Sequence, residues 1–162
     1  MSRKTRFCIM LAIALPALAI DRLSKYWAAN WLVVQTGGAA KAWPGVFGWL
    51  YAENTGMAFS ALSGATGLLG AFSAVMIAAI GLYVLFAREM PRTLLAGLSL
   101  IAAGGAGNLW DRLFYGYVID FIHLEFMRFA IFNVADICVC CGAGLVILWL
   151  LLSGRGAKGA KA

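Results

Sequence analysis

The apolar positions of this chain fall into four long runs separated by polar segments. The runs cover about residues 7–27, 66–86, 93–110 and 132–152. The last three approach or reach the roughly 20 residues that an α-helix needs to cross the hydrocarbon core of a bilayer. In the first run, the apolar stretch FCIMLAIALPALAI continues into DRLSKYW, where Asp21, Ser24 and Lys25 keep one polar face on the helix. The pattern predicts a mainly α membrane protein with four transmembrane helices.

The first run also has the features of a cleavable secretory signal. Basic residues precede a short apolar stretch, and Ala17 and Ala19 form a small-residue cleavage pattern. The polar helical face that follows favours a retained span instead.

Two longer polar segments, about 28–65 and 111–131, connect the spans on one side of the membrane. Aromatic and β-branched residues in both segments favour short strands, and Asn54-Thr55-Gly56 is typical of a turn. We expect a small β-sheet resting on the outer membrane surface. Aromatic side chains at headgroup level would anchor it there, namely Trp31, Trp43, Trp49 and Tyr51.

Composition limits what else the chain can hold. It is 63% hydrophobic and 12% charged, with a mean hydropathy of +0.87, so its 162 residues leave no room for a large soluble domain. We expect a single integral-membrane domain, residues 1–162, that ends in a flexible basic tail of about residues 153–162. The four cysteines lie in apolar runs without metal-site spacing and are interpreted as packing residues.

The basic residues predict the orientation. The net charge of +6 comes from short clusters beside apolar runs, which membrane topology and anionic lipid headgroups explain better than nucleic acid does. The clusters before the first span, between the second and third and after the fourth share one side: Arg3, Lys4, Arg6, Arg88, Arg92, Arg155, Lys158 and Lys161. Both termini should therefore be cytoplasmic.

Two carboxylates stand out as candidate chemical groups. Asp136 lies about one helical turn, roughly 6 Å, inside the outer end of the fourth span, and ionisable residues at such depths are functional candidates. Asp120 lies in the apolar segment YVIDFI, where an alternating strand would bury it against the membrane surface. Two such carboxylates brought together would share a proton, so that one could activate water while the other donates to a carbonyl.

Polar residues at the span ends could support this pair. Asn108, Asp111 and Arg112 share one face of the third span, as Asp21 and Lys25 do on the first. Interfacial salt bridging and helix capping are an equally good explanation for these charges. The neighbouring Gly104, Gly105 and Gly107 fit close helix packing.

Other chemistries remain open on the residues alone. The single histidine, His123, could serve a metalloprotease, although HExxH is absent. Ser24 and Lys25 could form a serine peptidase pair, but they are adjacent rather than spaced to meet. A proton-coupled transporter could use the same carboxylates as a relay, and a noncatalytic lipid-binding or assembly protein would need neither.

Five polar blocks, in order, make the chain resemble the lipoprotein signal peptidases, the signal peptidase II family. The blocks are DRLSKYW with Asp21 and Lys25, ENTGMAFS with Asn54, Gly56, Ala58 and Phe59, GNLWDR with Asn108, Asp111 and Arg112, GYVIDFI with Asp120, and FNVAD with Asn133 and Asp136.

The resemblance implies an aspartic endopeptidase of the bacterial inner membrane with Asp120 and Asp136 as catalytic residues. It would remove the signal peptide of a prolipoprotein, cutting before the diacylglyceryl-modified cysteine at the periplasmic face. Asn54, Asn108, Arg112 and Asn133 would bind the substrate backbone or hold the dyad, with Asp21 and Lys25 in support. We expect membrane lipids around a monomer, and no metal, cofactor or nucleic acid.

Overall fold

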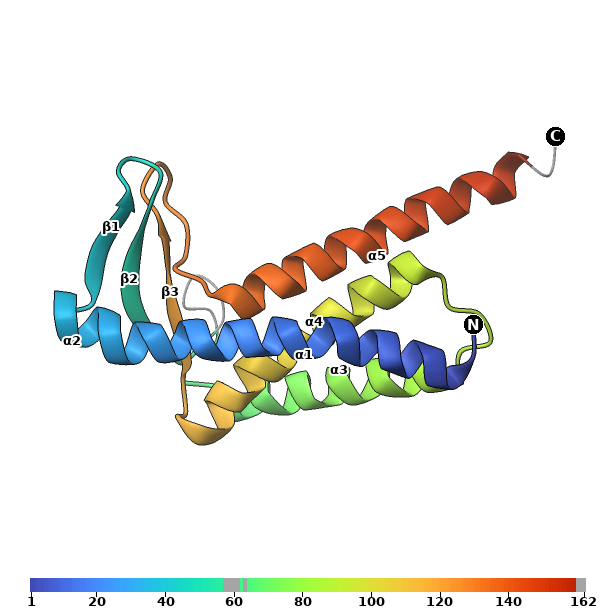
Figure 1. The fold of residues 1–162 in the computed structure, drawn as a ribbon, viewed down its shortest axis with the longest axis horizontal. Coiled ribbons are helices and arrows are strands. Elements are labelled where there is room, and N and C mark those ends of the chain that lie inside the picture. The colour runs from blue at the N-terminus through green and yellow to red at the C-terminus, as the bar shows by residue number, and fades with distance from the viewer. Residues whose placement is uncertain (57–61, 63, 160–162) are drawn as a thin grey trace.

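Four long helices and a three-stranded sheet make up the part of the chain that the structure describes (Figure 1). The structure is a computed structural model and describes residues 1–56, 62 and 64–159. The long helices are α1 (Arg3–Trp27), α3 (Thr66–Phe86), α4 (Arg92–Phe114) and α5 (Val134–Gly159). All four are long and apolar enough to cross a membrane, which confirms the predicted fold class.

Helix α1 does not end where the sequence pattern predicted. A π-helical turn, η1 (Ala28–Leu32), and a last turn, α2 (Val33–Thr36), continue it to Thr36, so the predicted outer loop 28–65 begins as helix. Nothing in AANWLVVQT breaks a helix until the glycine pair that follows. Gly37 adopts the left-handed conformation (φ 68°) that caps the helix end.

The sheet stands at one end of the helices. Its strands β1 (Ala39–Trp43), β2 (Phe47–Asn54) and β3 (Val118–Leu124) are antiparallel in the order β1-β2-β3. Because side chains alternate along a strand, Ile119 and Phe121 of β3 face the end of the first helix and pack on Ala28 and Leu32. Asp120, between them, faces the other way.

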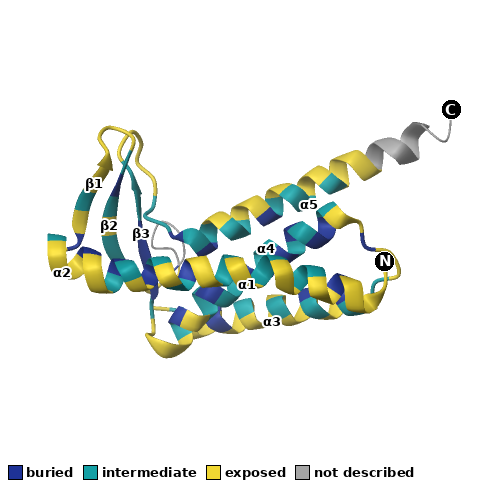
Figure 2. Ribbon diagram, viewed as in Figure 1, coloured by how far each residue is buried: buried dark blue, intermediate teal, exposed yellow. Residues whose placement is uncertain are grey.

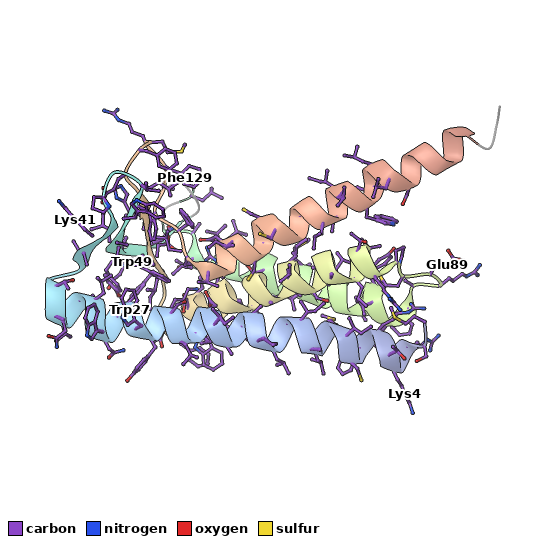
Figure 3. All side chains as sticks on the ribbon, turned by 45° about the horizontal axis from the view of Figure 1, so that its top comes forward. Lys4, Trp27, Lys41, Trp49, Glu89 and Phe129 are labelled. Atoms are coloured by element: carbon purple, nitrogen blue, oxygen red, sulfur yellow. The ribbon has the colours of Figure 1, made fainter. Side chains whose placement is uncertain are left out.

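Aromatic rings fill the junction between the sheet and the first helix. Trp27 meets Trp49 of β2 edge to face at 5.3 Å between ring centroids, and it also contacts Phe121. Figure 3 shows Trp49 on the sheet and Trp27 close to it at the end of α1. Ring contacts therefore fix the sheet to the end of α1.

Helices α4 and α5 pack backbone against backbone. A Cβ at Gly97 would lie 2.7 Å from the carbonyl oxygen of Gly142, and one at Gly142 would lie 2.6 Å from that of Gly97. Gly104 approaches the carbonyl of Ala135 in the same way. Small residues permit this separation, as the sequence predicted for Gly104, and they bring the N-terminus of α5 to the polar end of α4.

The ends of α4 and α5 also lie beyond the predicted limits. Helix α4 continues to Phe114 rather than 110, where the chain turns at Gly116 with φ 78°. Helix α5 continues to Gly159, so the predicted tail from 153 begins as helix. Fewer residues therefore remain in the outer segment 111–131 than the pattern suggested.

The N-terminus and the end of helix α5 lie at the end of the molecule opposite the sheet (Figure 1). Arg6 is buried there and donates to the carbonyls of Ala87 and Arg88, which close the end of α3. Lys4 and Glu89 project from this same end (Figure 3). Between the two ends, exposed apolar residues cover the outward helix faces (Figure 2), as expected of surfaces that contact lipid.

Candidate active site

The two aspartates singled out from the sequence lie at the junction of the sheet and the helices. Asp120 is on β3 and is 3% exposed, whereas Asp136, in the first turn of α5, is only partly buried. One residue, Asn133, contacts both. Its Nδ2 donates to Asp120 Oδ1 at 2.6 Å, and its backbone N–H donates to Asp136 Oδ2 at 3.1 Å.

Asn133 also caps helix α5. Its Oδ1 accepts the backbone N–H of Asp136 at 3.0 Å, while the Asp136 carboxylate accepts the backbone N–H of Asn133. This reciprocal pair is a capping box built from Asn and Asp. The local sequence NVAD therefore both starts the helix and orients the Asp136 carboxylate.

Two further asparagines complete the hydrogen bonding of the carboxylates. Asn54, the last residue of β2, donates from Nδ2 to Asp120 Oδ2 at 2.9 Å. Asn108 of α4 donates from Nδ2 to Asp136 Oδ1 at 2.9 Å. Each oxygen of both aspartates thus accepts at least one N–H, and three amide side chains fix the pair.

Lys25 determines how the amide of Asn108 is oriented. Its ammonium donates to Asn108 Oδ1 at 2.9 Å, and Asn133 Nδ2 lies 3.2 Å from the same oxygen. With its oxygen held by these donors, Asn108 must present its NH2 group to Asp136. A rotated amide would place donors against donors.

A neutral cluster of four charges lies behind this amide. Lys25 contacts Asp21 at 3.2 Å and Asp111 at 2.7 Å, and Arg22 contacts the same two carboxylates at 2.9 and 2.7 Å. Both acids are buried and fully paired, as burial of charge requires. The predicted polar faces of the first and third spans therefore meet.

Asp21 and Asp111 also hold the chain immediately before each candidate catalytic residue. Asp21 Oδ1 accepts the N–H of Ala135 at 3.0 Å, and Asp111 Oδ2 accepts that of Ile119 at 3.3 Å. Ala135 precedes Asp136 and Ile119 precedes Asp120. The charge cluster thus fixes the backbone immediately before Asp136 and immediately before Asp120.

Gly107 makes room for this arrangement. A Cβ there would lie 2.5 Å from Asp21 Oδ2 and 3.3 Å from the side chain of Ala135. Gly105 has only ordinary contacts with Ile77 on α3. Close packing, as predicted from the sequence, is thus required at Gly107 but not at Gly105.

Arg112 connects the end of α4 to the turn after β2. Its Nη2 donates to the carbonyl of Gly56 at 3.1 Å, and Gly56 N–H donates to Asn54 Oδ1 at 2.9 Å. Its Nε is buried and has no partner among residues 1–56, 62 and 64–159. The other residues assigned to this block by resemblance, Ala58 and Phe59, lie outside the described residues.

Burial raises the pKa of the Asp120 carboxyl to about 6, compared with its ordinary value of 3.8. The hydrogen bond from Asn54 acts in the opposite direction, the nearby Asp136 raises the pKa, and Asn133 and Lys25 lower it. Asp120 therefore retains a proton at pH values where an exposed aspartate has lost it.

The residues proposed for other chemistries lie elsewhere. His123 is on the face of β3 opposite Asp120, since it is an odd number of residues away. Ser24 donates to the carbonyl of Asp21 within its own helix. Neither the metalloprotease nor the serine peptidase interpretation gains a site from these positions.

Sequence reasoning missed Arg22 and the capping box. Arg22 was counted only as a charge on the outer side, and nothing local predicts that it would bridge two carboxylates from α1 and α4. The capping box had a signal, because Asn followed three residues later by an acid is a known helix start.

The family described as Signal peptidase (SPase) II matches residues 13–152 of the chain, nearly the whole folded part. The chain belongs to the signal peptidase II family. It is therefore a membrane peptidase that removes signal peptides from prolipoproteins, and the transporter interpretation is not supported.

Relatives and solved structures agree with this placement in the signal peptidase II family. The lipoprotein signal peptidase of Pseudoalteromonas translucida is 46% identical over 123 residues, which cover 72% of this chain and 74% of the relative. The lipoprotein signal peptidase of Streptococcus thermophilus is 36% identical over 148 residues, which cover 90% of this chain and 96% of that relative. A solved bacterial membrane enzyme has a TM-score of 0.84 at 26% identity, covering 91% of this chain and 90% of its own.

Proposed function

We propose that this member of the signal peptidase II family is an aspartic endopeptidase whose catalytic pair is Asp120 and Asp136. The main support is Asn133, which hydrogen-bonds both carboxylates and so holds them in one site. Asn54, Asn108, Asp21, Lys25 and Asp111 would keep the pair and its backbone in position.

In the proposed reaction the pair carries one proton. The ionised carboxylate takes a proton from a water molecule while the oxygen of that water attacks the scissile carbonyl carbon. The protonated carboxyl group donates its proton to the carbonyl oxygen. Collapse of the tetrahedral intermediate breaks the C–N bond, and the amine leaves with a proton from the dyad. No metal ion is needed for these reaction steps.

Arg112 is proposed to bind the substrate backbone. Its guanidinium is tied to Gly56 by one N–H only, and its buried Nε lacks a partner in the described part of the chain. A buried, unpaired donor is unfavourable, and a carbonyl of an extended peptide beside the turn at Gly56 would pair with it. This contact would position the peptide next to the dyad.

The proposed orientation places both termini in the cytoplasm and the dyad at the periplasmic face of the bacterial inner membrane. Four spans would return the chain to its starting side, and the basic residues before the first span and between α3 and α4 lie at the end opposite the sheet. A monomer contains every group that the proposed reaction uses.

The proposed substrate is a prolipoprotein whose cysteine carries a diacylglyceryl group, cut on the N-terminal side of that cysteine. We expect the purified chain in detergent to cleave the lipidated precursor and leave a diacylglyceryl-cysteine N-terminus, measured by mass spectrometry. The same precursor without the lipid should be cleaved far more slowly, and EDTA should change neither rate. Equal cleavage of both precursors would contradict the lipid requirement, and loss of activity with EDTA would contradict the metal-free dyad.

Lys25→Met should move the pH dependence of cleavage to higher pH. The positive charge of Lys25 lowers the pKa of Asp120, so its removal lets the pair keep its shared proton to higher pH. An opposite charge a few ångström away changes a carboxyl pKa by about 1–3 units. Because Asn108 lies between Lys25 and Asp136 of the pair, we expect the pH profile of kcat/KM to shift by on the order of 1 unit. Lys41→Met, an exposed lysine on β1, is the control. A uniform loss of rate with an unshifted profile would mean that Lys25 does not set the pKa of the pair and acts through the position of Asn108 or through folding.

A further inference from the structure

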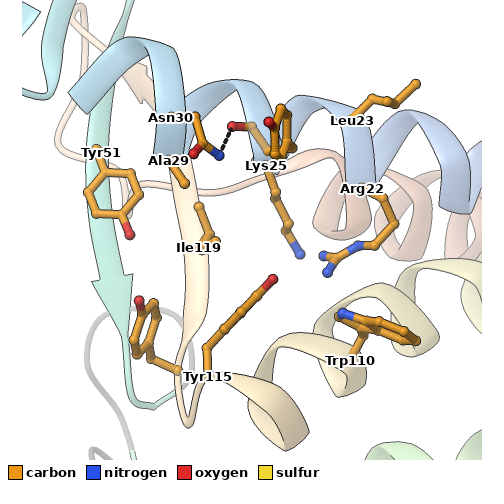
Figure 4. A pocket seen from close by; sticks show the side chains of 11 residues that line it. Arg22, Leu23, Lys25, Ala29, Asn30, Tyr51, Trp110, Tyr115 and Ile119 are labelled. Carbon is orange, nitrogen blue, oxygen red and sulfur yellow. Dashed lines mark hydrogen bonds between the residues drawn. The ribbon is translucent and has the colours of Figure 1, made fainter. Parts of the chain in front are cut away.

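A cavity lies on the face of the sheet opposite the proposed dyad. It has a volume of about 580 Å³ and is bounded by α1, the end of α4, β2 and the start of β3 (Figure 4). Tyr117 and Ile119 line it, whereas Asp120 points to the other side of β3 because side chains alternate. The proposed peptide-cleaving site does not use this space.

The polar groups at the cavity surface are hydrogen-bond donors and hydroxyls. Arg22 and Lys25 reach it from α1, and four tyrosines line it from α1, from β2 and from the segment between α4 and β3, namely Tyr26, Tyr51, Tyr115 and Tyr117. In Figure 4 the Arg22 guanidinium and the Lys25 ammonium face the same space, whereas Tyr51 lies beyond Ile119, and its hydroxyl bonds to Glu53. Among the described residues, no carboxylate lines the cavity.

The charge cluster presents its cationic side to this cavity. The side chain of Arg22 is 24% exposed, whereas those of Asp21 and Asp111 are 1% and 0% exposed. Arg22 uses Nε, both Nη2 hydrogens and one Nη1 hydrogen on Asp21, Gly107 and Asp111. Among the described residues none accepts the second Nη1–H, so a ligand there would meet the guanidinium and not the acids behind it.

Asn30 adds an acceptor to the same wall. Its Nδ2 donates to the carbonyl of Tyr26, so its Oδ1 can accept from a ligand hydroxyl. The wall therefore offers a cation for a phosphate, and hydroxyl and amide groups for a hydroxylated headgroup.

The cavity opens at the level where the spans end. Leu23, Tyr26, Trp110 and Tyr115 border it and are 69%, 69%, 48% and 51% exposed, and they lie on the last turns of α1 and α4 or just after α4. Such aromatic residues occupy the membrane interface. A ligand with its phosphate on Arg22 can extend its chains past Leu23 into the hydrocarbon.

We propose that this cavity binds the headgroup of one anionic glycerophospholipid with a hydroxyl-bearing headgroup, of the phosphatidylglycerol type. Arg22 contacts the phosphate, the tyrosine hydroxyls and Asn30 contact the headgroup hydroxyls, and the acyl chains lie along the outward faces of α1 and α4. The bound lipid seals the outer end of the α1–α4 interface, where the charge cluster is otherwise open to water.

Native mass spectrometry of the full chain, extracted from bilayers of equal phosphatidylcholine and phosphatidylglycerol, tests this site. We expect the wild-type chain to retain one phosphatidylglycerol. Ala29→Leu should reduce its retention about tenfold, because it fills the cavity without touching a charge and removes a hydrogen bond to the phosphate worth at least 1.4 kcal/mol. Arg22→Gln should reduce it similarly, and Lys41→Gln, which removes an exposed charge on β1, should not.

Three results would overturn the proposal. Undiminished phosphatidylglycerol retention in Ala29→Leu would show that the lipid binds elsewhere. Equal losses in Arg22→Gln and Lys41→Gln would show that only total charge attracts the lipid. Displacement of the lipid by millimolar glycerol 1-phosphate would assign the cavity to a soluble phosphate ester. Because Ala29→Leu leaves the charge cluster intact, the test does not depend on Arg22→Gln folding.

Discussion

Asp120→Asn and Asp136→Asn should each abolish measurable cleavage of a lipidated prolipoprotein. Each substitution removes either the base that accepts a proton from water or the acid that donates to the carbonyl. Positioned proton transfer is worth about 10²–10⁴-fold in rate, and the two carboxylates act as one unit, so the double variant should be no slower than either single one. Initial rates with the purified variants measure this.

The control for these variants is Glu53→Gln. Glu53 is an exposed acid on β2, next to Asn54 but outside the hydrogen bonding of the dyad. It should keep near wild-type turnover, and all variants should accumulate in the membrane. Substantial turnover by either Asp→Asn variant would remove that aspartate from the proposed mechanism.

Substitutions at Asn133 should separate its two roles. Asn133→Ala removes both the helix cap and the 2.6 Å donor to Asp120, so we expect a rate loss of about 100-fold or more, comparable to removal of one preorganised donor, together with about 1 kcal/mol of lost stability. Asn133→Ser keeps a side-chain oxygen that can cap the helix, but its shorter side chain has no amide N–H to donate to Asp120. It should melt near the wild-type temperature and still be slow.

Gln35→Ala serves as the control, because Gln35 is an exposed amide on α2 and lies outside the hydrogen bonding of the dyad. Its turnover and melting temperature should be unchanged. If Asn133→Ser recovered full activity, the contribution of Asn133 would be helix capping alone. Thermal melting in detergent and initial rates on the same samples distinguish these cases.

Much of this architecture is visible in the sequence. The four apolar runs predict the spans, because crossing hydrocarbon demands length and apolar character that no other structure needs. The depth of Asp136 follows from counting residues into the fourth run. The polar faces of the first and third spans are also readable, since i, i+3 and i+4 spacing places side chains together on any helix.

The partners of these residues are not readable in the same way. The bond from Ala135 to Asp21 joins positions 114 residues apart, and it exists because α4 and α5 approach through glycines that only the packed structure pairs. The extension of α1 to Thr36 was missed because AANWLVVQT was assigned to the outer loop. This stretch contains no Gly or Pro, so the helix continues until Gly37.

The tie between Asp21 and Ala135 has a consequence for how the protein is made. Asp21 enters the membrane with α1, and its backbone partner arrives only with α5, which is synthesised later. Until that segment is inserted, Asn133 and Asp136 are missing and Asp120 lacks its shortest hydrogen bond. A chain that lacks α5 therefore cannot assemble the proposed dyad, and we expect hydrolytic activity to appear only after the fourth span is inserted.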